Sequence, residues 1–389
     1  MRVLVGVAAA GVAAAMSVGA LETDAAQQGR AMPAAVAAPM PNPVAAYHGK
    51  LLVPAGLKVD DYARVPGARL MALGPDGSVY VSQTGAGTVV RLVDANGDGV
   101  AERSAVVAEG LHLPHGLAVH GGWLYVANTD EVVRIKLNAA GVAEGTPQPT
   151  AARYDAAGGH FTRTVVFGPD DAMYVAVGST CNICVEKDST RAAVLRFDAE
   201  GHHGIVFARG LRNAVGLAIH APTGALWVSQ HERDNLLPSH EDLPPEELNI
   251  LREGGDYGWP YCFGDRVPNP EFNDAARCAS TLPPALAMQA HSAPLGLAFL
   301  AGATQLPADY RGDALLAFHG SWNRRVPTGA KVVRIRIRGG RPVGYEDFLT
   351  GFQEGDGRRW GRPVDVLVLK DGSVLVSDDD AGMIYRVHR

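Results

Sequence analysis

The stretch GPDGSVYVSQTGAGTVVRL, from Gly74 to Leu92, contains the pattern that decides the fold. A turn rich in glycine and proline precedes Val79–Gln83, whose alternation is that of a half-buried β-strand. A second polar turn leads to another apolar run, which ends next to Arg91. The stretch therefore predicts short strands joined by tight turns.

Five further segments of the chain repeat this arrangement. They are GLAVHGGWLYVANTDEVVRI from Gly116, GPDDAMYVAVGS from Gly168, GLAIHAPTGALWVSQ from Gly216, GLAFL from Gly296 with DALLAFHGSW and KVVRIRI after it, and DVLVLKDGSVLVSDDDAGMIYRV from Asp365. Self-similarity along a chain is the sequence signature of a repeat architecture.

The central strands of the six units give the length of the repeat. They are centred on Tyr80, Tyr125, Tyr174, Trp227, Leu316 and Leu375, at intervals of 45, 49, 53, 89 and 59 residues. A period of about 45 residues with several strands per unit is typical of propeller blades and not of a solenoid. We therefore predict an all-β fold, a six-bladed β-propeller with four-stranded antiparallel blades around a central channel.

The interval of 89 residues between the fourth and fifth central strands leaves room for an additional segment. We expect the chain to leave the ring from Asn235 to about Ser292 and to cover one face. Within this segment, Leu243–Glu253 (LPPEELNILRE) is the only candidate for a helix.

The N-terminal residues have the composition of an export signal. Met1-Arg2 precedes an apolar, alanine-rich stretch, Val3–Ala20, that ends in small residues suited to cleavage. A membrane anchor is the alternative, because the stretch is barely long enough to span a bilayer. Alanine where an anchor would have leucine favours the signal, so no stable membrane insertion is expected after cleavage. We predict a signal peptide at residues 1–20, a flexible linker at 21–46, a propeller at 47–389, and a periplasmic or secreted protein.

Composition and charge limit the possible partners. The chain has 389 residues, of which 47% are hydrophobic and 20% are charged, and its formal net charge is -6. Nucleic-acid binding requires a basic surface, so no nucleic-acid partner is expected. A mildly acidic protein is compatible with a small, uncharged substrate.

The four cysteines allow three interpretations. Cys181 and Cys184 form a C-x-x-C motif, while Cys262 and Cys278 lie sixteen residues apart. A zinc site would need a second C-x-x-C, and a redox-active pair would need a thioredoxin-like βαβ setting. Disulfides suit an exported protein best, and pairing within each neighbouring couple is the simplest connectivity.

Five motifs occur in one order along the chain. They are GGHFTRTVVFGPD with His160, GLRNAVGLAIH with Arg212, GGDYGWPYCFGD from Gly254, HGSWNRRVPTGAKVVRI from His319, and GRPVDV from Gly361. Together they resemble the glucose/sorbosone dehydrogenases, soluble sugar dehydrogenases that use pyrroloquinoline quinone (PQQ), and more closely the sorbosone-type branch. The resemblance covers about Leu51 to Arg389.

The resemblance implies roles for three of these residues. His160 corresponds to the catalytic histidine, a general base that takes the hydroxyl proton while hydride leaves the sugar carbon. Arg212 corresponds to the arginine that stabilises charge on the quinone oxygen. Asn213 corresponds to an asparagine that contacts the cofactor. Where glucose-oxidising relatives orient the histidine with an aspartate, this chain has Ser179 or its neighbour Thr180.

The resemblance also implies residues that hold the cofactor and a calcium ion. Arg362 and Arg359 match arginines that bind the quinone's carboxylates, for which a guanidinium group is well suited. Glucose-oxidising relatives have a lysine that contacts the cofactor, and Arg324 is the candidate to replace it in this chain. Calcium would be held through the backbone carbonyls of Glu232 and Arg233. A separate acidic run, Asp94–Gly99, lacks the glutamate of a complete calcium loop and is interpreted as a hairpin turn.

The expected function is therefore PQQ-dependent oxidation of a sugar or ketoaldose at an aldehyde or hemiacetal carbon. The electrons would leave to an external acceptor such as a cytochrome. Two other functions remain open, because a propeller supports many activities. One is a calcium-dependent lactonase, which would need several acidic side chains in the channel. The other is a non-catalytic exported propeller that binds a partner or a glycan.

Overall fold

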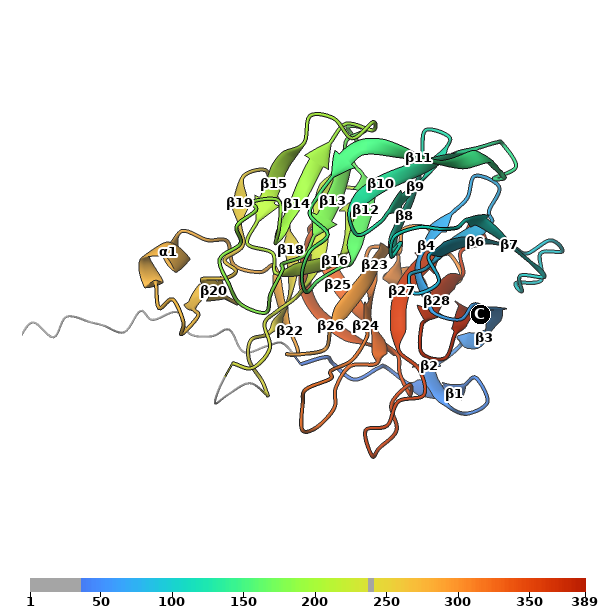
Figure 1. Cartoon of the computed structure of the whole chain (residues 1–389). Helices are drawn as coiled ribbons and strands as arrows, with labels where there is room; N and C mark the ends of the chain where they lie inside the picture. Colours follow the sequence, from blue (N-terminus) through green and yellow to red (C-terminus); the bar gives the residue numbers. More distant parts are fainter. Residues whose placement is uncertain (1–35, 237–240) are drawn as a thin grey trace, which may run out of the picture.

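The computed structural model describes residues 36–236 and 241–389 (Figure 1). The predicted signal peptide, residues 1–20, and the first part of the predicted linker lie outside the described residues. Six antiparallel sheets follow one another around a ring, as the repeat predicts.

The first three blades follow the chain in order, each with its four strands in sequence. Blade 1 consists of β4 (Ala68–Leu73), β5 (Val79–Gln83), β6 (Thr88–Val93) and β7 (Arg103–Ala108). Blade 2 consists of β8 (Gly116–His120), β9 (Trp123–Ala127), β10 (Glu131–Leu137) and β11 (Ala143–Arg153). Blade 3 consists of β12 (Arg163–Phe167), β13 (Met173–Val177), β14 (Ala193–Phe197) and β15 (Ile205–Arg209).

The last three blades contain longer connections, and the sixth uses a strand from the N-terminal part of the chain. Blade 4 consists of β16 (Asn213–His220), β17 (Ala225–His231), β18 (Glu246–Ile250) and β22 (Leu286–Met288). Blade 5 consists of β23 (Pro294–Phe299), β24 (Ala314–Phe318), β25 (Lys331–Arg338) and β26 (Arg341–Leu349). Blade 6 consists of β27 (Pro363–Val368), β28 (Val374–Asp378), β29 (Met383–His388) and β3 (Lys58–Arg64).

The blades pack into a closed ring around an apolar axis. The first strands contact one another in the order β4, β8, β12, β16, β23, β27 and back to β4. Six apolar clusters each fill the gap between two neighbouring blades. A seventh cluster joins the first strands of four blades and consists of Leu70, Val215, Leu295 and Val364. Burial of these side chains provides the main driving force for ring formation.

Pairing between the two ends of the ring closes it. Strand β3 forms the outer edge of blade 6, where it pairs antiparallel with β29 near the C-terminus. Tyr62 on β3 is 1% exposed and belongs to the apolar cluster between blades 6 and 1. Closure of this kind removes the open sheet edges that a linear array would leave.

An arginine–aspartate pair recurs at the same place in three blades. The aspartate lies in the turn between the first and second strands, and the arginine lies on the third strand. The pairs are Asp76–Arg91 at 2.7 Å, Asp170–Arg196 at 2.6 Å and Asp371–Arg386 at 2.6 Å. In these three units the arginine at the end therefore ties the third strand to the turn between the first two strands.

The six central strands predicted from the sequence are confirmed as the second strands of the six blades. The one candidate for a helix, Leu243–Glu253, is not helical, because Glu246–Ile250 forms strand β18. Pairing with β17 and β22 outweighs the local preference of so short a segment.

The excursion predicted from Asn235 to Ser292 is only partly correct, since it contains two strands of blade 4. The remainder contains β19 (Gly255–Asp256), β20 (Cys262–Phe263), β21 (Val267–Pro268) and the helix α1 (Ala275–Ala279). Strand β19 extends blade 3 by pairing in parallel with β15.

The described part of the predicted linker lies on the ring. Ala38 forms an isolated bridge with Glu346 of blade 5, and β1 (Pro43–Ala46) pairs with β2 (Leu51–Pro54). Ala38 therefore lies beside β26, and residues 43–46 lie beside β2. No helix among the described residues has the length and apolarity needed to cross a bilayer.

The topology gathers the predicted site residues on one face, which we call the site face. Strands of a blade alternate in direction, so the start of a first strand and the end of a second strand lie on the same side. Such positions are occupied by His160 before β12, Arg212 before β16, Glu232 and Arg233 after β17, Arg324 after β24, and Arg359 and Arg362 before β27. In Figure 1 the loops after β24 and β26 project from the lower side of the ring.

Candidate functional site

His160 lies in the loop before β12 and is oriented by Ser179. Its Nδ1 lies 2.9 Å from the hydroxyl oxygen of Ser179 and 3.1 Å from the carbonyl oxygen of the same residue. A carbonyl oxygen can only accept, so Nδ1 carries the proton and Nε2 has the lone pair. Of the two candidates for the partner of His160, Ser179 and Thr180, it is therefore Ser179 that contacts the ring.

The surroundings of His160 keep its ring neutral. Burial, together with the positive charge of Arg212, lowers the pKa of His160 to about 3. The backbone N–H of Ser179 donates to the carbonyl oxygen of Arg212 (2.7 Å), which joins the two loops. A neutral imidazole with a free lone pair can accept a proton at neutral pH.

Arg212 is 4% exposed and is held by hydrogen bonds on every side of its guanidinium group. Nε and Nη2 donate to the carbonyl oxygen and Oδ1 of Asn182 (3.0 and 2.9 Å), while Nη1 donates to the carbonyl oxygen of Glu232 (2.8 Å). Two contacts are longer, from Nη1 to the carbonyl oxygen of His231 (3.4 Å) and from Nη2 to Asp234 (3.5 Å). These weaker contacts are the ones a ligand oxygen could replace.

Asn213 lies close to His160 because a glycine separates them. A Cβ atom on Gly178 would lie 2.6 Å from both Asn213 Oδ1 and His160 Cβ, so only glycine fits there. Asn213 is 5% exposed, and its Oδ1 has no hydrogen-bond partner among the described residues. A buried amide oxygen without a partner is suited to receive a donor from a bound molecule.

The predicted calcium ligands lie where Arg212 already makes contact. The carbonyl oxygen of Glu232 accepts the hydrogen bond from Arg212, and the side chain of Arg233 bonds Asn269 (3.2 Å) and Glu271 (2.6 Å). A divalent cation at the Glu232 carbonyl would lie against a guanidinium group, which like-charge repulsion disfavours. The Glu232 carbonyl oxygen therefore does not fit calcium in the present arrangement.

Buried carboxyl groups lie beneath this loop. Glu246 accepts hydrogen bonds from the backbone N–H groups of Glu232 (2.8 Å) and Ala293 (3.0 Å). Burial raises the pKa of Glu232 to about 7 and that of Glu246 to about 8, and it raises the pKa of Glu247 well above its usual range. These carboxyls are buried, whereas a calcium-dependent lactonase would need several acidic side chains converging in the channel.

A pocket of about 420 Å³ brings together the two arginines predicted to bind carboxylates, Arg359 and Arg362, and the predicted lysine substitute, Arg324. It is lined by Ser321, Trp322, Arg324, Pro327, Gly357, Arg359, Arg362 and Asp380. Arg362 donates from Nε and Nη2 to the carbonyl oxygens of His319 (3.1 Å) and Gly320 (3.2 Å). Its Nη1 has no partner among the described residues and is available to a carboxylate.

The other two arginines are more fully committed to the protein. Arg359 donates to Ser321, Thr328 and Gln353 through all three of its nitrogens. Arg324 donates to the carbonyl oxygen of Glu241 and lies 3.5 Å from the carboxylate of Asp242. Both arginines add positive charge to the pocket, whereas Arg362 keeps one nitrogen, Nη1, without a partner among the described residues.

Both predicted disulfides are confirmed. Cys181 pairs with Cys184 and Cys262 pairs with Cys278, so the structure has no free cysteine among its described residues. The first bridge closes the loop after β13 on the site face. The second joins β20 to helix α1.

A chain of charged and polar groups on the site face was not predicted from the sequence. His319 Nε2 lies 2.9 Å from Asp379, whose other oxygen pairs with Arg69 (2.7 Å). Arg69 Nη2 lies 3.1 Å from His115 Nε2. His319 begins the HGSWN motif, but nothing in the sequence indicates its partner, since these residues come from four different blades.

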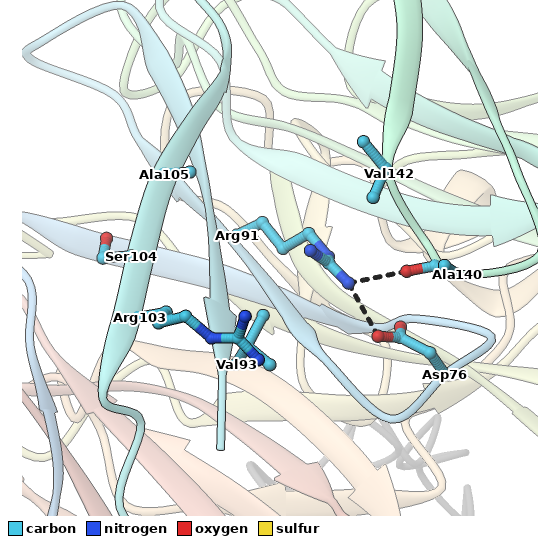
Figure 2. Close-up of a pocket in the computed structure, with 8 residues that line it drawn as sticks. All are labelled: Asp76, Arg91, Val93, Arg103, Ser104, Ala105, Ala140 and Val142. Carbon is cyan, nitrogen blue, oxygen red and sulfur yellow. Dashed lines mark hydrogen bonds and ion pairs between the residues drawn. The ribbon is translucent and has the colours of Figure 1, made fainter. Parts of the chain in front are cut away.

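Two other groups of polar residues lie away from this site. Carboxylate oxygens of Asp94, Asp98 and Glu102 lie within 4.8 Å of one another near the turn between β6 and β7. These two strands pair antiparallel, which confirms the hairpin predicted there. A pocket of about 430 Å³ lies between blades 1 and 2, where Arg91 bonds Asp76 and the carbonyl oxygen of Ala140 (Figure 2). Asp76 lies in the turn between β4 and β5, the first and second strands of blade 1. This places the pocket toward the face of the ring opposite the site face.

Comparison with curated proteins finds relatives that are similar in sequence. Pyrroloquinoline quinone-dependent pyranose dehydrogenase from Coprinopsis cinerea is 26% identical, and the match covers 82% of this chain and 52% of that protein. An uncharacterized protein from Borreliella burgdorferi is 33% identical over 56% of this chain and 58% of its own. The chain thus spans a little over half the length of these two relatives.

Solved structures share the architecture. An iodide structure of the Trichoderma reesei family AA12 carbohydrate-active enzyme has a TM-score of 0.77 at 23% identity, covering 90% of this chain and 98% of that one. The holo form of the pyranose dehydrogenase PQQ domain from Coprinopsis cinerea has a TM-score of 0.74 at 24% identity, covering 91% and 100%. A family model described as TrAA12-like matches residues 55–389. Because that match includes all six blades, the chain belongs to the TrAA12-like family.

Proposed function

We propose that this protein is a PQQ-dependent sugar dehydrogenase that oxidises a sugar or ketoaldose at an aldehyde or hemiacetal carbon. The observation that carries the proposal is the geometry of His160, whose ring is fixed by Ser179 and remains neutral beside the cation of Arg212. The PQQ-dependent relatives and the TrAA12-like family model support the same class of reaction.

The residues on the site face fit a flat molecule that carries carboxylates. Arg362 Nη1 would bind a carboxylate, with Arg324 and Arg359 adding positive charge around the same pocket. The unpartnered Oδ1 of Asn213 would accept a donor from the cofactor. When bound, PQQ supplies an acceptor for the hydride of the sugar.

His160 would act on the substrate hydroxyl. Its Nδ1–H donates to the Ser179 carbonyl oxygen, so the Nε2 lone pair can accept the hydroxyl proton as the adjacent C–H bond breaks. Arg212 would hold a fixed positive charge where negative charge develops, and its rigid contacts avoid reorganisation during the reaction.

Calcium is not part of the proposed reaction. The resemblance implies an ion at the carbonyl oxygens of Glu232 and Arg233, but Arg212 Nη1 already donates to the first of these. Arg212 supplies positive charge at that position, so no step of the proposed reaction is assigned to calcium.

The sorbosone-type specificity, the external acceptor and the cellular location are further parts of the proposal. The motif pattern favours a ketoaldose of the sorbosone type and an acceptor such as a cytochrome. The apolar N-terminal stretch favours a periplasmic or secreted protein.

The deciding experiment is titration of the purified apo-protein with PQQ, followed by dye-linked oxidation of a panel of aldoses and ketoaldoses. We expect saturable PQQ binding and turnover of at least one sugar. Arg336→Ala, which alters an exposed arginine of blade 5, is the control for nonspecific binding of an anionic quinone. Absence of PQQ binding by the folded parent protein would reject the proposal and favour a binding propeller.

A further inference from the structure

The loop closed by the Cys181–Cys184 disulfide contacts Arg212 directly. Asn182, inside the loop, accepts from Arg212 Nε through its carbonyl oxygen (3.0 Å) and from Nη2 through Oδ1 (2.9 Å). Two of the three guanidinium nitrogens are therefore held by one residue, from its backbone and from its side chain. This paired contact fixes both the position and the plane of the group.

The same loop also determines the orientation of His160. The hydroxyl of Ser179 donates to the carbonyl oxygen of Cys181 (2.7 Å). Its only proton is thereby used, so the Ser179 oxygen can only accept from His160 Nδ1, 2.9 Å away. Cys181 thus determines which way the hydroxyl points, and the hydroxyl oxygen becomes a second acceptor for the proton that the Ser179 carbonyl oxygen already places on Nδ1.

Several contacts hold the loop in place. The disulfide joins residues only three positions apart, on both sides of Asn182. The amide of Asn182 also donates to the carbonyl oxygen of Asp234 (3.0 Å) and accepts from its backbone N–H (2.9 Å). Outside the bridge, the carboxylate of Glu186 accepts from the backbone N–H (2.6 Å) and the hydroxyl (2.8 Å) of Thr180.

We propose that the disulfide loop, residues 181–184, positions the two reacting side chains of this site, with Asn182 as the positioning residue for Arg212. The inference rests on the proposed function, since it concerns how His160 and Arg212 are aligned for that reaction. The bridge fixes the carbonyl oxygens of Cys181 and Asn182, so one element aligns the proton acceptor and the cation together.

The test compares four variants with the parent protein. They are Asn182→Ala, Asn182→Asp, the double variant Cys181→Ser/Cys184→Ser and, as a matched control, Cys262→Ser/Cys278→Ser. Three quantities are measured: the dissociation constant of PQQ, the single-turnover rate of cofactor reduction at saturating sugar, and the midpoint of thermal unfolding. Serine variants are preferable to thiol reductants, because a reductant would itself reduce the quinone.

Loss of alignment should slow the reaction without abolishing cofactor binding. We expect Asn182→Ala and Cys181→Ser/Cys184→Ser to reduce the single-turnover rate about 10- to 100-fold, the scale of a small misplacement in an active site. Asn182→Asp keeps an oxygen for Arg212 Nη2 and should restore much of that rate. Movement of Arg212 away from His160 should also shift the acid limb of the pH–rate profile to higher pH, which loss of stability alone would not do.

The outcomes separate this inference from the proposed function. If the parent reduces PQQ and both loop variants react as fast as the parent, the positioning role is rejected. It is rejected also if the control double variant slows the reaction equally, since that points to general destabilisation. If the parent neither binds nor reduces PQQ, it is the proposed function that fails.

Discussion

His319 Nε2 lies 2.9 Å from the carboxylate of Asp379, so the site face also holds a histidine that is oriented by an acid rather than by a serine. Burial lowers the pKa of His319 to about 4, and the contact with Asp379 opposes that shift. Its Nε2 is occupied by the carboxylate, whereas Nε2 of His160 has no hydrogen-bond partner among the described residues. The geometry therefore favours His160 as the base.

Substitution of the two histidines tests this assignment. His160→Ala should lower the single-turnover rate of cofactor reduction about 10²- to 10⁴-fold, the usual contribution of a positioned general base. The dissociation constant of PQQ should change little, because the pocket of Arg324, Arg359 and Arg362, and not His160, would bind the carboxylates of PQQ. His319→Ala should keep most of the rate. The reverse result, with His319→Ala inactive and His160→Ala active, would assign the base to the His319–Asp379 pair.

The pH dependence follows from the lowered pKa of His160. A base acts when it is unprotonated, and a folded-state pKa of about 3 keeps the ring neutral well below the ordinary histidine value of about 6.5. The single-turnover rate should therefore remain level as the pH falls through 6.5 and should decrease only at more acidic pH. Arg212→Gln removes a nearby positive charge, so its acid limb should move to higher pH. An acid limb at 6.5 in the parent protein would contradict this.

Arg362 should affect cofactor affinity more than the chemical step. Loss of a hydrogen bond to a charged group costs about 1.5–3 kcal/mol, so Arg362→Ala should raise the dissociation constant of PQQ about 10- to 150-fold. The single-turnover rate at saturating PQQ should stay near that of the parent, because the contact is shared by ground and transition states. Isothermal titration with Arg336→Ala as the control measures the first effect. Unchanged affinity would show that the carboxylates bind elsewhere.

Chelation tests whether Arg212 takes the place of calcium. Since Arg212 Nη1 donates to the Glu232 carbonyl oxygen, EDTA should leave PQQ affinity within about threefold of its original value. The measurement is a PQQ titration before and after exhaustive chelation, repeated with added Ca²⁺. A large loss that calcium alone restores would mean that the guanidinium group moves aside for the ion.

Ring closure by β3 should dominate stability. Tyr62 is buried between blades 6 and 1, and truncation of a large buried side chain costs about 3–5 kcal/mol, so Tyr62→Ala should lower the free energy of unfolding by that amount. Lys58→Ala, at an exposed position of the same strand, should change it by no more than about 0.5 kcal/mol. Urea denaturation of both variants gives the comparison. Equal stability would show that closure does not depend on this packing.

The sequence predicted the parts of the fold that repeat. The central strands around Tyr80 and Leu375 share a local pattern, so six blades could be counted without any knowledge of long-range contacts. Strand β18 could not be predicted in this way, because its two buried glutamates interrupt the apolar pattern that a buried strand usually shows. The pairing of β3 with β29 was also hidden, since it joins segments more than 300 residues apart.

The site residues divide in a similar way. His160, Arg212 and Arg362 lie in local motifs and were predicted, and the structure brings their loops to one face. Asn182 and Asp379 were missed, because their roles arise only where loops of different blades meet. The identity of the neighbour of His160 also depended on which of two adjacent hydroxyls faces the ring, which spacing alone does not determine.

The place of β3 in blade 6 has a consequence for how the protein is made. Synthesis proceeds from the N-terminus, so β3 leaves the ribosome more than 300 residues before its partner β29. Five blades can form before β29 has been made, while the sixth must wait until residues 383–388 have left the ribosome. Until then β3 presents an unpaired edge, the kind of surface that recruits chaperones or aggregates. Premature termination anywhere before Met383 would therefore yield an open ring, however many blades had already formed.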